Sequence, residues 1–72
     1  MFGIDRVTAG RLQRMYPSGT RVKLMHMEDV HAPAVGTCGT VVGVDDIGTI
    51  HVQWDNGSCL GVVYGEDAIT KE

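Results

Sequence analysis

Three histidines and two cysteines are the residues of this chain best suited to metal or thiol chemistry. His26, His31, His51, Cys38 and Cys59 carry enough nitrogen and sulfur atoms for a zinc site. Their spacing contains no paired Cys-x-x-Cys or similar ligand pattern. His51 is also expected to point outward from a strand. We therefore expect solvated histidines and half-buried cysteines, with no metal ion and no cofactor.

Nucleophilic catalysis requires a nucleophile, an activating base and a site that stabilises the oxyanion. Cys38 is expected in a loop, and His31 precedes it by seven residues. Nothing else in the sequence supports a catalytic dyad, so the sequence predicts a protein that is not an enzyme.

Acidic residues mark two of the expected turns. Asp45, Asp46 and Asp55 could meet at one end of a barrel and bind a hard cation through carboxylate oxygens. No calcium-loop spacing is present, which favours the alternative that these aspartates accept hydrogen bonds from turn amides. Asp45, Asp46 and the turn residue Asn56 are kept as candidate ligand-binding residues.

Trp54 and Tyr64 are the main aromatic candidates for contacting a ligand. Trp54 is structural if it closes the core, as its inward phase on the strand favours. At the barrel rim it could instead stack on a base or a proline ring. Tyr64 is the better candidate, because it ends its strand, and the loop after the first strand would overhang the same rim. The candidate site therefore also includes three residues of that loop: Met27, Asp29 and His31.

Glycines recur at short intervals between runs of β-branched residues, and this pattern predicts short strands joined by tight turns. A helix is expected first, with Asp5 as its N-cap, Val7, Leu12 and Met15 on one stripe, and Pro17 beyond its end. The residue pattern gives the following expected elements: a helix over 5–15, strands over 21–26, 40–45, 49–54 and 58–64, a loop over 27–37, a turn over 65–68 and a closing strand over 69–71.

The hairpin after Trp54 has two possible registers. A two-residue loop of Asn56 and Gly57 would place Val52 opposite Gly61. A three-residue loop that includes Asp55 would place Val52 opposite Leu60 and match the apolar residues of both strands on one face. A slip of one residue would lose this match, so we favour the three-residue loop.

These elements predict a mainly β fold, a small five-stranded SH3-like barrel with a short N-terminal α-helix. The helix and its lead-in occupy residues 1–17 and the barrel residues 18–72, within one domain. A chain of 72 residues has a thin core, and such domains often gain stability from oligomerisation, so we expect a homo-oligomer. A disulfide between the two cysteines remains open, although a reducing compartment disfavours it.

The charge balance bears on the partners. The formal net charge is −3, and four of the six basic residues lie within the first 21 positions, so the β portion is the more acidic part. Duplex nucleic-acid binders usually need a basic face, so nucleic acid is disfavoured as a partner. No secretory signal or membrane-spanning apolar run is visible, and the expected location is the cytoplasm.

Several motifs occur in order along the chain: Tyr16-Pro17-x-Gly19-Thr20-Arg21-Val22, then Gly36-Thr37-x-Gly39-Thr40-Val41, then Val44-Asp45-Asp46-x-Gly48-x-Ile50-x-Val52-x-Trp54-Asp55-Asn56-Gly57-Ser58-x-Leu60, and Tyr64-Gly65-x-Asp67. In this order they resemble a family of small bacterial and phage proteins known only as a domain of unknown function. The chain departs from the family at Glu28, where an aspartate often stands, and at Cys59, where a small polar residue is usual. The resemblance implies a compact barrel, often encoded on phages and mobile elements, and implies no activity.

Together these observations predict a non-catalytic binding module. Its expected partner is a host protein or a nucleotide-type small-molecule signal, which the protein would sequester, with a role against host defence. The alternative is an adaptor barrel that binds RNA or a ribonucleoprotein, for which Arg6, Arg11, Arg14, Arg21 and Lys23 could form one basic patch.

Overall fold

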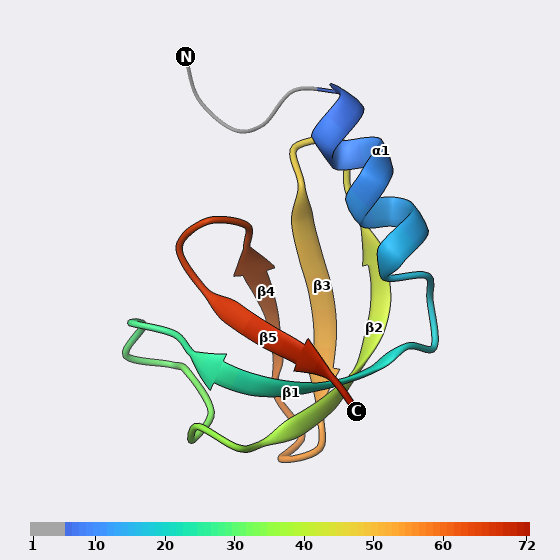
Figure 1. Ribbon diagram of the computed structural model, residues 1–72. Coiled ribbons are helices and arrows are strands. Elements are labelled where there is room, and N and C mark those ends of the chain that lie inside the picture. Colours follow the sequence, from blue (N-terminus) through green and yellow to red (C-terminus); the bar gives the residue numbers. More distant parts are fainter. Residues whose placement is uncertain (1–5) are drawn as a thin grey trace.

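A computed structural model describes residues 6–72 as one helix followed by five strands (Figure 1). The elements are α1 (Arg6–Met15), β1 (Arg21–His26), β2 (Cys38–Val44), β3 (Thr49–Trp54), β4 (Cys59–Val63) and β5 (Ala68–Lys71). The predicted mainly β fold with five strands and an N-terminal helix is confirmed. The predicted N-cap, Asp5, lies outside the described residues.

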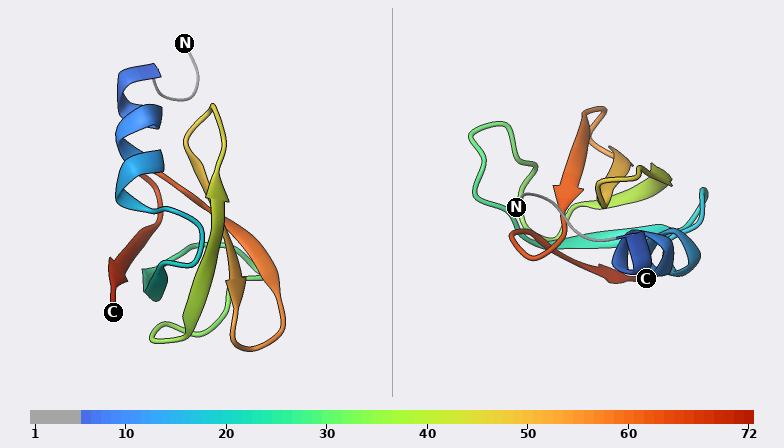
Figure 2. Two further views of the ribbon diagram at one scale, coloured as in Figure 1. Left: turned by 90° about the vertical axis from the view of Figure 1, so that its right-hand side faces the viewer. Right: turned by 90° about the horizontal axis from the view of Figure 1, so that it is seen from above.

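The strands form one antiparallel sheet in the order β4-β3-β2-β1-β5. Figures 1 and 2 show that β1 and β5 run across β2, β3 and β4, so the sheet curls around its own inner face. The sheet does not close, because β4 pairs with β3 and β5 pairs with β1, and only one isolated bridge between Tyr64 and Asp67 links their adjoining ends. This open arrangement is compatible with a small barrel-like fold.

The core is the inner face of the curled sheet. Alternate positions along each strand point inward, as the period of two residues requires. Trp54 is 1% exposed, and its indole Nε1 donates a hydrogen bond to the carbonyl oxygen of Leu60 at 3.2 Å. Of the two positions left open for Trp54, the structure therefore shows the core, and its candidacy as a rim ligand contact is wrong. The buried cluster consists of Val22, Leu24, Val41, Ile50, Val52, Trp54 and Val62.

The β3–β4 hairpin has the predicted three-residue loop. Val52 pairs with Leu60, and the Trp54 amide donates to the carbonyl of Ser58 at 2.8 Å. Gly57 takes the left-handed conformation with φ of 94°, which glycine adopts without steric cost. Asn56 Oδ1 accepts the Ser58 amide at 3.0 Å, so the side chain closes the turn.

The helix presents a different face to the sheet from the predicted one. Ala9 and Leu12 are buried, whereas Val7 is 68% exposed and Met15 is 42% exposed. Gln13 Nε2 donates to the carbonyl oxygen of Val44 at 3.2 Å, which fixes α1 against the end of β2. The buried face of the helix therefore includes Ala9 and Leu12 and leaves out two residues of the predicted apolar stripe, Val7 and Met15.

Gly39 lies opposite Trp54 in the β2–β3 ladder, and this position has no room for a side chain. A Cβ at Gly39 would stand 2.6 Å from Val52 Cγ1, 2.8 Å from Trp54 Cε3 and 2.9 Å from the Gln53 carbonyl oxygen. The backbone contact cannot be relieved by a side-chain rotation. Close approach of the two strands therefore requires glycine here.

We expect Gly39→Ala to lower the free energy of unfolding by about 1–3 kcal/mol, because the added methyl group overpacks the core. Chemical denaturation monitored by Trp54 fluorescence measures the change. Gly43→Ala is the matched control on the same strand, because its Cβ meets no atom within 4 Å. The control should remain within about 0.5 kcal/mol of the parent. Equal losses in the two variants would contradict the close approach at Gly39.

Candidate functional site

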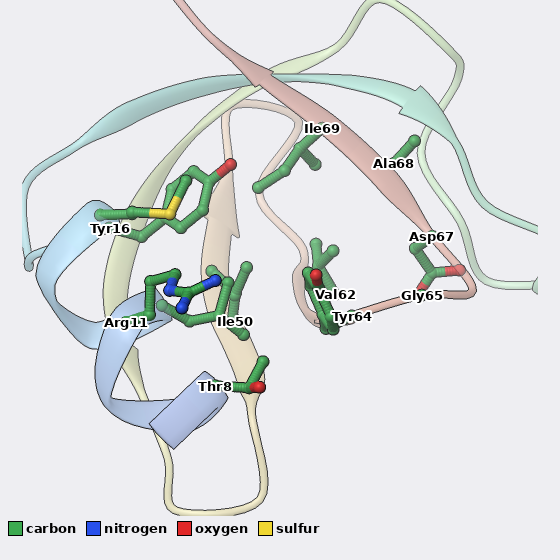
Figure 3. A pocket seen from close by; sticks show the side chains of 12 residues that line it. Thr8, Arg11, Tyr16, Ile50, Val62, Tyr64, Gly65, Asp67, Ala68 and Ile69 are labelled. Carbon is green, nitrogen blue, oxygen red and sulfur yellow. The ribbon is translucent and has the colours of Figure 1, made fainter. Parts of the chain in front are cut away.

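A pocket of about 390 Å³ lies between α1 and the gap that separates β4 from β5 (Figure 3). Sites for small molecules commonly range from about 300 to 1,000 Å³. The helix forms one wall, β3 and β4 contribute to the floor, and the β4–β5 turn with the start of β5 forms the opposite wall. Segments distant in the sequence therefore meet around a single space.

The floor of the pocket is apolar. Leu12, Ile50 and Val62 line it and are almost fully buried, and the half-buried Ile69 adds a further aliphatic surface from β5. Such a floor supplies contact area to a ligand without fixing its orientation. Orientation must come from the polar groups at the walls.

Two tyrosines stand in the walls. Tyr64 follows β4 directly and is 52% exposed, so one face of its ring is available for stacking. Tyr16 follows α1 and is half-buried. Lys71 Nζ lies 5.3 Å from the centre of the Tyr16 ring, within the range of a cation–π contact. The pocket thus combines an accessible phenol ring with one held between α1 and β5.

Of the residues that the structure describes, Arg11 and Asp67 are the two ionised side chains that line the pocket. Arg11 is exposed on α1, and its guanidinium has no hydrogen-bond or ion-pair partner within residues 6–72. Asp67 Oδ2 accepts the Val63 amide at 2.8 Å across the β4–β5 turn. Figure 3 shows the two side chains on opposite sides of the pocket. The cavity is therefore positive at the helix wall and negative at the turn wall.

Of the residues predicted from the sequence, Tyr64 lies in this pocket, and Met27, Asp29 and His31 do not. No residue of the 27–37 loop lines this pocket, and the role of that loop in ligand binding stays a prediction. Met27 packs against the core, and Asp29 Oδ1 accepts the His31 amide at 2.7 Å, which serves the loop itself.

The acidic turns do not come together. Asp45 precedes β3 and Asp55 follows it, so they occupy opposite ends of that strand, and the suggested meeting of the carboxylates is wrong. Asp45 Oδ1 accepts the amides of Ile47 at 3.1 Å and Thr49 at 2.9 Å, which is the turn-capping role. Asp46 lines a second pocket against the opening turns of α1.

Asp55 instead belongs to a charged network on the outer face of the sheet. Arg21 pairs with Asp55 at 2.6 Å and with Glu72 at 3.3 Å. The hydrogen bond from Arg21 lowers the pKa of Asp55, and the one from Cys38 lowers that of Glu72. Because its charge is compensated, Arg21 is not available to a basic patch formed with the arginines of α1.

The thiol of Cys38 lies beside a carboxylate. Both cysteines are free. Cys38 Sγ donates to Glu72 Oε1 at 2.9 Å, and this hydrogen bond to a carboxylate raises the pKa of the thiol. A raised pKa reduces the thiolate fraction that nucleophilic chemistry needs. Across residues 6–72, no group of three or more His, Cys, Asp or Glu side chains is placed to hold a metal ion.

Sequence reasoning missed Arg11, Tyr16 and Asp67 as pocket residues. A weak signal for the helix wall was present, because Thr8, Arg11, Leu12 and Met15 are spaced by three and four residues and so share one helical face. The sequence does not reveal which element that face meets.

Acid should weaken the fold partly through Asp45. His51 Nε2 lies 2.9 Å from Asp45 Oδ2, and this hydrogen bond, followed by those from the turn amides, lowers the pKa of Asp45. A carboxyl with a lowered pKa in the folded state contributes stability that is complete above its ordinary value, about 4, and is lost as the pH falls through the folded-state value. We expect Asp45→Asn to melt at a lower temperature than the parent at pH 7 and to lose less on acidification.

Melting temperatures, measured by circular dichroism from pH 7 down to below the ordinary carboxyl pKa of about 4, show how much stability each variant loses on acidification. Asp46→Asn is the matched control, because the neighbouring carboxylate is exposed and makes no hydrogen bond within the described residues. The control should keep the pH profile of the parent. Identical profiles for Asp45→Asn and the parent would contradict the contribution of Asp45.

The comparisons with known proteins bear on family and not on activity. No curated protein and no solved structure matches the chain. Among the described residues, no helix has the length and apolar character needed to span a membrane. The family model described as "Domain of unknown function (DUF4314)" matches residues 2–72, which is nearly the whole chain. The chain therefore belongs to the DUF4314 family, a domain of unknown function.

Proposed function

We propose that this protein is a non-catalytic binding module whose ligand site is the pocket between α1 and the β4–β5 gap. The proposed ligand is a small molecule of nucleotide type. The observation that carries the proposal is the combination, in one cavity, of an apolar floor, the exposed Tyr64 and the guanidinium of Arg11, which has no partner within residues 6–72.

The chemistry of the lining suits such a ligand. A planar base would stack on Tyr64 while its edge rests on Ile50 and Val62, since every base presents an aromatic face. A guanidinium binds phosphate or carboxylate through paired N–H groups, and the guanidinium of Arg11 has no partner among the described residues that a ligand would have to displace. Among the described residues, no cysteine, histidine or lysine lines the cavity, so the lining supports binding better than nucleophilic catalysis.

Sequestration is the biological role we propose for this binding. The resemblance to small bacterial and phage proteins and the size of 72 residues support a stoichiometric binder of a host component, with a role against host defence. The two free cysteines fit the reducing cytoplasm of a bacterial host. A homo-oligomer would enclose the ligand more completely than one thin domain can.

An RNA-binding adaptor is the second candidate. Arg6, Arg11 and Arg14 are exposed on the same short helix, which favours contact with phosphates. Arg21 adds nothing to this surface, because Asp55 and Glu72 compensate its charge. Binding to RNA that weakens steeply with salt, and that is insensitive to substitution of Tyr64, would favour this candidate.

Native mass spectrometry of the untagged protein, before and after exposure to a nucleotide-rich lysate, tests the proposal. The parent should acquire a defined small-molecule mass. Tyr64→Ala should keep its fold, because Tyr64 is half-exposed, and should lose binding about tenfold or more through the lost stacking. A bare protein, or a mass that Tyr64→Ala retains in full, would overturn the proposal.

Val63→Ala is the matched control for this experiment. Val63 is the neighbouring residue at the end of β4, is 41% exposed and does not line the pocket. Its side chain points to the face opposite to that of Val62. The control should therefore bind the same mass as the parent.

A further inference from the structure

We infer that the pocket accepts its ligand in a single orientation, with an anionic group on Arg11 and hydrogen-bond donors of a planar ring directed at Asp67. This inference rests on the proposed function and names the ligand class more narrowly. The predicted ligand is a nucleotide whose base carries an exocyclic amino group.

The helix wall selects the anionic end. Among the described residues, Arg11 is the one cation that lines the pocket, and its guanidinium has no hydrogen-bond or ion-pair partner within residues 6–72. Lys71 Nζ, 5.3 Å from the ring centre of Tyr16, adds a second positive charge beside this wall. A phosphate group placed here would form charge-assisted hydrogen bonds with the guanidinium, and these are the stronger kind.

The turn wall selects hydrogen-bond donors. Asp67 is the one carboxylate that lines the pocket in the described part of the chain, and it is half-buried. Its Oδ2 holds the Val63 amide at 2.8 Å, which fixes the side chain and leaves Oδ1 without a hydrogen-bond donor in the described chain. An ionised carboxylate only accepts hydrogen bonds. An amino group on the ring would satisfy Oδ1, whereas a carbonyl oxygen at the same place would face it as a second acceptor.

The residues between the two walls determine which chemical group can connect the anionic end of the ligand to its hydrogen-bond donors. Ile50 and Val62 offer buried aliphatic surface, and Tyr64 offers a half-exposed aromatic ring between Arg11 and Asp67 in the view of Figure 3. A flat ring suits this middle section better than a polar or bulky group. Anion, ring and amino group must therefore follow one another along the ligand.

Isothermal titration calorimetry with AMP, adenosine and IMP on the full chain tests the inference. The parent should bind AMP about tenfold or more tightly than either adenosine or IMP, as expected when a hydrogen bond to a charged group is lost. Arg11→Gln should weaken the binding of AMP about tenfold and leave the affinity for adenosine unchanged, because adenosine has no phosphate. Asp67→Asn keeps an oxygen acceptor for the Val63 amide and should remove the preference for AMP over IMP.

Arg14→Gln is the matched control, because Arg14 is exposed on the same helix and does not line the pocket. It should bind all three compounds as the parent does, and melting temperatures check that every variant is folded. Equal affinity for AMP and IMP, equal loss of AMP and adenosine in Arg11→Gln, or no binding of any of the three compounds would overturn the inference. In each of those cases a Tyr64-dependent mass captured from lysate would still support the proposed function, and its absence would overturn that function separately.

Discussion

The structure depends on the close contact between the indole of Trp54 and the backbone of Gly39. The two residues face each other across β2 and β3, and the glycine has no side chain to hold the strands apart. The register that pairs these two residues also places Val41 opposite Val52 on the inner face. In so short a chain a single large ring fills much of the interior, so the inner residues have few other ways to pack.

The pocket is a product of how this sheet ends. The strands curl around Trp54, but β4 and β5 part beyond the Tyr64–Asp67 bridge and do not pair along their length. The helix α1 packs at the end of β2 and covers part of the resulting gap without filling it. A site built in this way takes its residues from the first and last parts of the chain, and the sheet between them holds those parts in place.

The sequence was most informative where a local pattern and a tertiary requirement agree. The alternation from Thr49 to Trp54 and the Asp55-Asn56-Gly57 turn predicted the strand, the loop length and the register, because a one-residue slip would reverse every side chain. The helix was assigned correctly, but its rotation was not, since Ala9 is buried whereas Val7, a member of the expected apolar stripe, is exposed. Tyr64, proposed from its place at the end of a strand, does line the pocket. Arg11 and Asp67 were not, because their roles come from elements that meet only after folding.

The two unpaired strand edges have a further consequence, for the behaviour of the protein at high concentration. An open edge can template the addition of a strand from another molecule and so begin aggregation. Here β4 has five residues with Gly61 at its centre, and β5 has four residues and ends on the charged Lys71. Short edges of this kind offer few consecutive backbone groups to an incoming chain. The length of these edge strands therefore limits how long a ladder an added strand could form with the open sheet.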